Sequence, residues 1–174
     1  MESGTRIESY VRRGGIAAGI ALVVLVVLAF RIPDGKGTLG ADVIVAISPT
    51  GELGVSRPGP FMSATGLRPG GTLSGDVEVA NQTGRRLAVR LRALPDSKDL
   101  DRLLVVDVRA GGARLYHGRL GGLRTKTAAF LLDSGRKRTL RVRASLPAAV
   151  RDGYAGRIET ISLELSSTVE AGRG

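Results

Sequence analysis

After residue 40, apolar and polar residues alternate along most of the chain, as they do in β-strands with one buried face. The alternating runs are short and are bounded by Gly, Pro or Asp, which predicts strands joined by turns at the roughly 8 to 12 residue spacing of a β-sandwich. We therefore predict an all-β domain over residues 41–169, an antiparallel two-sheet β-sandwich of about seven to nine strands. Besides the stretch described next, the predicted strands are Ala41–Ile47, Phe61–Leu67, Leu104–Ala110, Ala113–Tyr116, Thr125–Leu132, Arg138–Leu146 and Arg157–Thr168.

The stretch Thr72–Ala93 carries the clearest alternation and predicts a β-hairpin. Pairing its two halves so that their apolar side chains share one face sets Asp76 opposite Arg90, which agrees with the charges. The same pairing leaves Gln82–Gly84 as a three-residue turn, and its glycine would take the positive φ that such a turn needs.

The N-terminal part of the chain has the pattern of a membrane-targeting segment. Gly14–Phe30 is an uncharged, mostly apolar run that predicts one N-terminal helix, either a signal peptide or a transmembrane signal anchor. Residues 1–13 are basic, which predicts a cytoplasmic N-terminus and places the following domain outside a bacterial cell membrane. Val27–Ala29 offers a possible cleavage site, so secretion to the cell surface after cleavage is the alternative. Residues 31–40 are a predicted linker and residues 170–174 a predicted tail.

The composition limits the chemistry of the chain. Aromatic residues make up 3% of it, so the core must be built from Val, Leu, Ile and Ala. Cysteine is absent, which excludes disulfides, thiolate metal sites and a cysteine nucleophile.

The formal net charge is +10, and arginine supplies 22 of the 26 basic groups. A positive surface of this kind favours anionic partners. Two rows of basic residues fall on the polar faces of predicted strands and would form one positive face if those strands were neighbours. That face could bind anionic wall polymers, whereas the near absence of aromatic residues for base stacking indicates no specific nucleic acid. The alternative is a solvated face in which nearby acidic residues neutralise the arginines. The candidate residues for polyanion binding are Arg86, Arg90, Arg92, Lys137, Arg141 and Arg143.

No constellation of residues indicates catalysis, a metal or a cofactor, and we predict that the protein is not an enzyme. The single histidine, His117, cannot make a zinc protease site by itself, and there is no nucleophile elbow. We expect it in a loop or at a strand edge. Asp96–Leu104 predicts a short helix or turn, and its aspartates together with Asp107 are expected to be solvated rather than to hold calcium.

Four short motifs, taken in order, resemble those of the camelysin/TasA family of exported bacterial matrix and spore-coat-associated proteins. The resemblance covers about residues 41–169. The motifs are Leu67-Arg68-Pro69-Gly70, the valine-rich stretch around Asn81-Gln82-Thr83-Gly84, Leu115–Leu123, and Leu146-Pro147 followed by Asp152–Gly156.

The resemblance implies a jelly-roll-like β-sandwich, export, and in some members assembly into fibres by donation of an N-terminal strand. The donor here would be Ala41–Ile47, with a second copy of the chain as the partner. The first hypothesis is therefore a cell-surface structural protein, either a matrix-fibre subunit or a membrane-tethered module, that acts by assembly and adhesion. The alternative is a membrane-anchored domain that binds anionic cell-wall polymers through its arginine rows.

Overall fold

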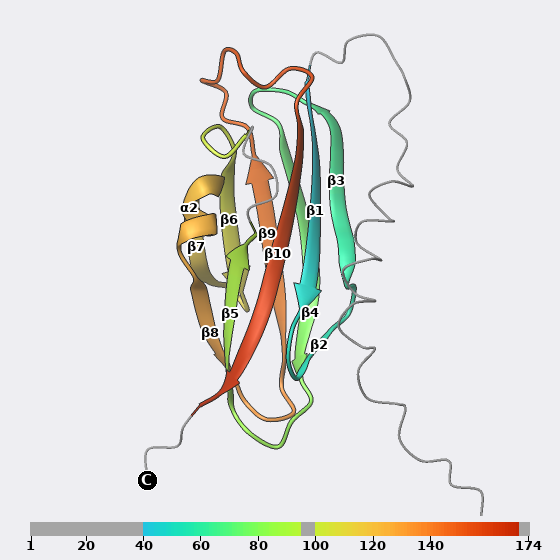
Figure 1. The fold of residues 1–174 in the computed structure, drawn as a ribbon, viewed down its shortest axis with the longest axis vertical. Helices are drawn as coiled ribbons and strands as arrows, with labels where there is room; N and C mark the ends of the chain where they lie inside the picture. Colours follow the sequence, from blue (N-terminus) through green and yellow to red (C-terminus); the bar gives the residue numbers. More distant parts are fainter. Residues whose placement is uncertain (1–39, 95–99, 171–174) are drawn as a thin grey trace, which may run out of the picture. The chain divides into compact units, whose positions relative to one another are not determined.

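The computed structural model describes residues 40–94 and 100–170, which form ten strands and one short helix (Figure 1). The strands lie in two five-stranded sheets. Sheet A has the order β3-β1-β10-β5-β8, and sheet B has the order β2-β4-β9-β6-β7. Sheet A contains β1 (Ala41–Pro49), β3 (Gly59–Leu67), β5 (Leu87–Ala93), β8 (Ala128–Leu132) and β10 (Ile158–Val169). Sheet B contains β2 (Leu53–Val55), β4 (Thr72–Asn81), β6 (Val105–Ala110), β7 (Ala113–Arg119) and β9 (Lys137–Ser145).

The prediction of a mostly β domain with two largely antiparallel sheets is confirmed. Two details differ from the prediction. The described residues contain ten strands rather than seven to nine. The neighbours β1 and β10 run parallel, whereas every other strand pair of the two sheets is antiparallel. A parallel pairing between the two ends of the domain has no local turn, so no short-range pattern could predict it.

The core lies between the sheets and is almost entirely aliphatic. On β9, Leu140, Val142 and Ala144 face inward and alternate with exposed polar residues. On β10, Ile161 and Leu163 do the same. Burying one such Val, Leu or Ile side chain contributes about 1.5–3 kcal/mol, so alternation alone selects which face of each strand turns inward.

The predicted hairpin over Thr72–Ala93 is wrong. Strand β4 pairs with β2 and β9 in sheet B, whereas β5 pairs with β10 and β8 in sheet A, so the chain crosses between sheets after Asn81. Asp76 consequently lies opposite Arg141 instead of Arg90. The alternating pattern is satisfied equally well when two strands face each other across a core as when they pair side by side, and this is why it misled the prediction.

The crossing is organised by a buried asparagine side chain rather than by a glycine turn. The Asn81 amide nitrogen donates to the carbonyls of Arg85 (2.8 Å), Leu132 (2.9 Å) and Asp133 (3.0 Å). Its Oδ1 accepts from the backbone N–H of Thr83 (2.9 Å). Gly84 does not adopt the predicted positive φ, because Asn81 turns the chain by hydrogen bonds.

Strand β1 is paired on both sides, antiparallel to β3 and parallel to β10. Its start is held by close glycine packing, since a Cβ on Gly40 would lie 2.2 Å from the carbonyl carbon of Gly66. The Asp42 carboxylate also accepts a hydrogen bond from the Gly66 N–H at 2.8 Å. The predicted donor segment Ala41–Ile47 is therefore an interior strand of its own sheet in this structure.

A buried ion-pair network anchors the only described helix, α2 (Leu120–Thr125), which the sequence analysis missed. Arg124 lies 2.6 Å from Asp101 and 2.8 Å from Glu159, whose side chain is fully buried. Glu159 also accepts a hydrogen bond from the Leu100 N–H at 2.9 Å. Two glycines lower the helix propensity of this segment, so packing and the Arg124 ion pairs stabilise it instead.

Several predictions concern residues outside the described ranges. They include the targeting segment Gly14–Phe30, the linker over residues 31–39 and the first four residues, 96–99, of the predicted helix Asp96–Leu104. In the latter, residues 100–103 form a turn in which the N–H groups of Leu103 and Leu104 donate to the Leu100 carbonyl. Within the described residues, no helix has the length and apolar character needed to span a membrane.

Candidate functional site

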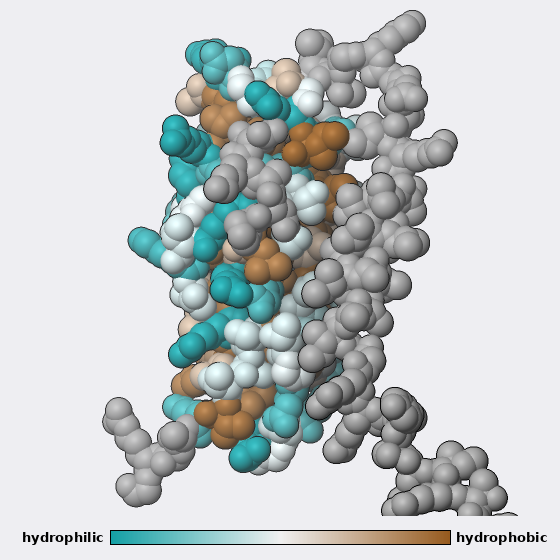
Figure 2. Space-filling view, viewed as in Figure 1, coloured by the Kyte–Doolittle hydropathy of each residue, from teal (hydrophilic) through white to brown (hydrophobic). Residues whose placement is uncertain are grey.

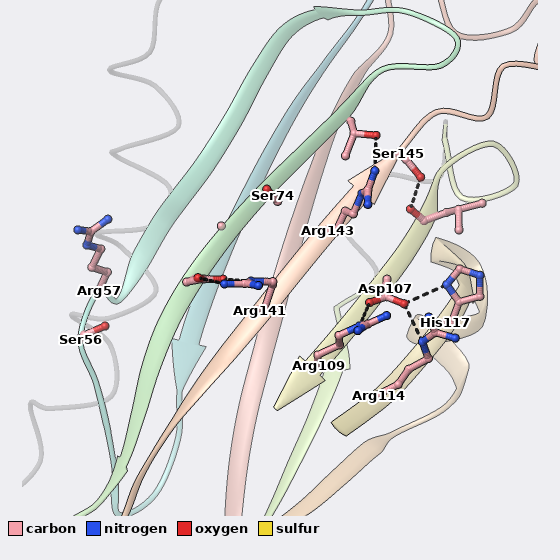
Figure 3. A pocket seen from close by; sticks show the side chains of 14 residues that line it. Ser56, Arg57, Ser74, Asp107, Arg109, Arg114, His117, Arg141, Arg143 and Ser145 are labelled. Carbon is pink, nitrogen blue, oxygen red and sulfur yellow. Dashed lines mark hydrogen bonds and ion pairs between the residues drawn. The ribbon is translucent and has the colours of Figure 1, made fainter. Parts of the chain in front are cut away.

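The outer face of sheet B is hollowed, with a cavity of about 1100 Å³ open to solvent (Figure 3). Outward-facing residues of β4, β9, β6 and β7 line it, together with the segment that follows β2. The lining is predominantly basic: two carboxylates, Asp76 and Asp107, face a larger set of cationic groups. Those groups are Arg57, Arg109, Arg114, Arg141 and Arg143, with His117 beside them.

The register of the strands brings like charges together in this hollow. Arg141 on β9 lies directly opposite Arg109 on β6, and on its other side it lies opposite Asp76 on β4. Like charges at directly opposite positions of neighbouring strands are destabilising. Asp107 and Asp76 each pair with one of these arginines, and an anion bound between the guanidinium groups would relieve the repulsion further.

Asp76 and Arg141 form a two-pronged ion pair at the centre of the hollow. The Arg141 Nε and Nη2 donate to the two carboxylate oxygens at 2.8 Å and 2.7 Å (Figure 3). The hydrogen bond from Arg141 holds the pKa of Asp76 below its usual value, and the same bond raises the pKa of Arg141. Both side chains are largely exposed, so this pair contributes little to the stability of the fold. Its main effect is to fix the orientation of the Arg141 guanidinium group.

Asp107 is surrounded by three cationic or potentially cationic side chains. Its carboxylate lies 2.9 Å from Arg109 Nε, 3.0 Å from Arg114 Nε and 3.2 Å from His117 Nδ1. Partial burial tends to raise the pKa of Asp107, but the hydrogen bond and charge of Arg109, with help from Arg114 and His117, bring it below its usual value. One negative charge is thus shared among several donors, which leaves this end of the hollow positive.

Two further arginines of the hollow form no ion pair within the described residues, although one of them, Arg143, lies opposite Asp107 in the register of β9 and β6. Arg143 reaches only the hydroxyl of Thr72, at 3.4 Å, and Arg57 forms no hydrogen bond or ion pair there. Five arginines against two aspartates give the hollow an excess of three positive charges, with His117 neutral. Guanidinium groups are planar donors suited to bidentate binding of oxyanions, so the arrangement can bind anionic groups from solution.

The six predicted polyanion-binding residues do not form one face, because the condition that their strands be neighbours is not met. Arg90 and Arg92 lie on the outer face of sheet A with Arg86 just before β5, whereas Lys137, Arg141 and Arg143 lie on β9 of sheet B. The two rows are separated by the core because β5 and β9 belong to different sheets. Only Arg141 and Arg143 line the hollow.

Several of the predicted residues are neutralised, as the alternative interpretation expected. Arg92 pairs with Glu164 at 2.7 Å and Lys137 with Glu78 at 2.8 Å. Arg86 lies 2.5 Å from Asp133, and Glu170 lies 3.6 Å from it on the other side. The Asp133 hydrogen bond accordingly raises the pKa of the Arg86 guanidinium.

Three arginines of the hollow were not among the sequence candidates. Arg109 belongs to the alternating run of β6, so its polar side chain could have been placed on the outer face. Arg114 lies after a register shift between Val108 and Arg109, which interrupts simple alternation. Arg57 lies in a Pro- and Gly-rich segment that carries no strand pattern.

His117 lies on β7, the edge strand of sheet B, as predicted for a strand-edge residue. Of the predicted aspartate cluster, Asp101 pairs with Arg124, Asp107 lies in the hollow, and the other two lie outside the described residues. Within residues 40–94 and 100–170, no group of three or more His, Cys, Asp or Glu side chains could hold a metal ion.

Comparisons with known proteins show no family. No protein-family model matches the chain, and no curated protein matches it. Among solved structures, the chain is similar to AvmM, which catalyses macrocyclization in alchivemycin A biosynthesis, at 12% identity over 72% of this chain and 93% of that one, with a TM-score of 0.34. It is also similar to an ASH/PapD-like domain of human CEP192, at 11% identity over 80% of this chain and 93% of that one, with a TM-score of 0.29.

Proposed function

We propose that this protein is a non-catalytic binding domain that uses the hollow on sheet B to hold an anionic polymer at the cell surface. In this proposal, Gly14–Phe30 directs the chain to a bacterial cell membrane, and the domain acts outside it, either tethered or released. The observation that carries the proposal is the excess of three positive charges within one hollow of about 1100 Å³. A cavity of that size exceeds what a single small anion needs and suits a segment of a polymer.

The electrostatics of the hollow support reversible binding. Arg109, Arg114, Arg141 and Arg143 sit on paired strands, so the attachment points of these guanidinium groups are fixed near one another before a ligand arrives, which lowers the entropy lost on binding. The Arg141 and Arg109 side chains are directed to Asp76 and Asp107 respectively (Figure 3). Arg143 and Arg57 have no such carboxylate partner, and they are the groups most available to an incoming anion.

Fibre assembly of the camelysin/TasA type, with its jelly-roll-like arrangement, has less support than polymer binding. Donation of Ala41–Ile47 to a second copy would require β1 to leave its pairings with β3 and β10. It would also remove Val43, Val45 and Ile47 from the core, where all three are fully buried. Withdrawing three such side chains costs several kcal/mol unless a neighbour returns the same contacts.

A matched pair of triple variants tests the proposal. Arg57, Arg114 and Arg143 would be changed to Gln, which removes the charge excess but keeps the Asp76–Arg141 and Asp107–Arg109 pairs. The control changes Arg86, Arg90 and Arg92 to Gln, which lowers the net charge by the same amount on the other side of the sandwich.

The measurement is the affinity of the full chain, in an uncharged detergent, for fluorescent polyphosphate over a range of salt concentrations. We expect the hollow variant to lose about 100-fold in affinity at low salt, with a salt slope shallower by about 2 to 3. The control should bind within about threefold of the wild type. Equal losses in the two variants would show that the overall charge, and not the hollow, binds the polymer.

A further inference from the structure

The spacing and chemistry of the hollow narrow the class of polymer, on the premise that the proposed function holds. Three arginines of the hollow besides Arg141 and Arg109 belong to different places across sheet B, and one of them, Arg114, shares the Asp107 carboxylate with Arg109. Arg57 follows β2, Arg143 lies on β9, and Arg114 lies on β7 (Figure 3). In the strand order β2-β4-β9-β6-β7, each is two strands from the next.

Neighbouring strands are about 4.8 Å apart, so two strands account for about 10 Å across the sheet. The arginines lie further apart than this because they do not share one row: Arg114 lies opposite Arg109, in the row of Arg141, two residues along the strand from Arg143. A ligand that satisfies all three arginines must therefore run across the strands and carry single anionic groups separated by uncharged spacers. A polypeptide with a carboxylate on every residue carries its charges at most about 3.6 Å apart along the backbone, which is far denser than the arginines.

The lining contains no Phe, Tyr or Trp. Proteins that bind single-stranded nucleic acids stack the bases on aromatic side chains, each stack contributing about 1–3 kcal/mol. Aromatic rings likewise provide flat apolar surface for ring-containing ligands. A hollow whose lining includes the imidazole of His117 but no Phe, Tyr or Trp gives little such surface to a base or a sugar ring, so a polymer with an open-chain backbone fits it better.

Hydroxyl groups lie between the charged side chains. Ser56, Thr72, Ser74 and Ser145 contribute to the lining, and hydroxyls both donate and accept hydrogen bonds. They match the hydroxyl groups of a polyol spacer. The guanidinium of Arg143, which forms no ion pair within the described residues, matches the two non-bridging oxygens of a phosphodiester.

We infer that the ligand of this hollow is a polyol phosphate, an open-chain polymer of glycerol or ribitol units joined by phosphodiesters. The binding mode follows from the positions of the lining residues. Arg57, Arg143 and Arg114 each bind one phosphodiester, and the serine and threonine hydroxyls bind the spacers. Arg141 and Arg109 remain paired with Asp76 and Asp107 and keep the hollow in shape.

The test compares four polymers at equal concentration of charge and at physiological salt, using the full chain in uncharged detergent. The polymers are poly(ribitol phosphate), oligo-dT, heparin and poly-γ-glutamate, each competing with fluorescent poly(glycerol phosphate). We expect poly(ribitol phosphate) to compete at least about tenfold better than the other three, a difference of about 1.4 kcal/mol. Equal competition by all four would overturn the inference while leaving the proposed function standing. Failure of the fluorescent polymer and all four competitors to bind would overturn both.

A conservative substitution adds a second readout. Arg143→Lys keeps the charge but replaces the planar fork by a point charge, and we expect about a tenfold loss of affinity for the polyol phosphate. Arg90→Lys on the outer face of sheet A is the control and should have no effect. If Arg143→Lys bound as tightly as the wild type, phosphodiester recognition by this guanidinium would be wrong.

Discussion

The two outer faces of the sandwich both carry rows of arginine, but they differ in how many carboxylates lie close to those arginines. Beside sheet A, two of the three predicted arginines have carboxylates within ion-pair distance, Arg86 with Asp133 and Glu170, and Arg92 with Glu164. In the hollow of sheet B, by contrast, five arginines share two aspartates. The number of arginines on a face therefore says little about its function. The balance of charge within reach of each guanidinium is the informative quantity.

The faces differ less in the residues between the arginines. On the outer side of β10, Thr160 and Ser162 alternate with the core residues Ile161 and Leu163, and Ser166 and Thr168 follow further along the strand. Figure 2 shows a surface on which hydrophobic patches are separated by hydrophilic and near-neutral residues, outside the part drawn in grey. Both faces therefore carry hydroxyls, but the face of sheet B combines them with an excess of positive charge and a hollow.

Reversing one charge on each face should give the largest contrast. Neither Arg143 nor Arg90 forms an ion pair within the described residues, so Arg143→Glu and Arg90→Glu break no ion pair there. Both substitutions change the net charge by the same amount. We expect Arg143→Glu to weaken polyanion binding by about 100-fold, because a repulsive group replaces an attractive one inside the hollow. Arg90→Glu should remain within about threefold, as measured by fluorescence anisotropy. A comparable loss of affinity in Arg90→Glu would contradict the claim that the polyanion binds to sheet B and not to sheet A.

Adding a carboxylate to the hollow should make it resemble sheet A. Ser74 lies opposite Arg143 in the register of sheet B, and Ser166 lies opposite Arg90 in sheet A. We expect Ser74→Glu to neutralise Arg143 and weaken binding by about tenfold. Ser166→Glu makes the same change opposite Arg90 and should alter binding less than twofold. Isothermal titration calorimetry on both variants decides between these outcomes.

The outcome of these substitutions could not have been foreseen from the alternating pattern alone. The pattern identified the outward positions of β9 and β5, including Arg141 and Arg90, but not which strands become neighbours. Sheet membership depends on contacts between distant segments, such as β1 with β10, that leave no local signal. The pairing of Asp76 with Arg141 and the assembly of the hollow both follow from that membership.

Local departures from regular strand structure prevented prediction of the remaining site residues. Arg57 lies outside any strand, and the register shift beside Arg109 placed Arg114 where alternation does not reach. The buried partners Arg124 and Glu159 were missed because charged residues in a helix or strand are ordinarily exposed. Their burial is visible only once α2 packs against the end of the sandwich.

The acid stability of the domain should depend on the carboxylates of the hollow. The pKa of Asp107 lies below its usual value of about 4, so its ionised form stabilises the folded state. That contribution is complete above the unfolded pKa near 4 and is lost as the pH falls through the lower folded pKa. Asp107→Asn should remove about 1 kcal/mol of stability at pH 6 and less at pH 2. Urea unfolding at the two pH values measures this, and an equal loss at both would contradict it.

The smallest expected effect is a gain of binding on sheet A. Glu164→Gln removes the partner of Arg92, which lies 2.7 Å away, and leaves that guanidinium available to an anion. We expect about a twofold gain in polyanion affinity, because a single surface arginine without a hollow adds little. Glu78→Gln, which frees Lys137 on sheet B, is the companion variant. A gain of tenfold or more from Glu164→Gln would show that sheet A is itself close to being a binding face.

The most direct test of the hollow is to observe its arginine side chains during binding. In a spectrum of arginine Nε–H groups, recorded on the ¹⁵N-labelled chain in uncharged detergent, poly(ribitol phosphate) would be added in steps. We predict that the Nε–H signals of Arg57, Arg114 and Arg143 shift and saturate together, while those of Arg90 and Arg92 stay in place. Saturating shifts of Arg90 and Arg92 with no change at Arg143 would contradict the assignment of the binding site to the hollow of sheet B.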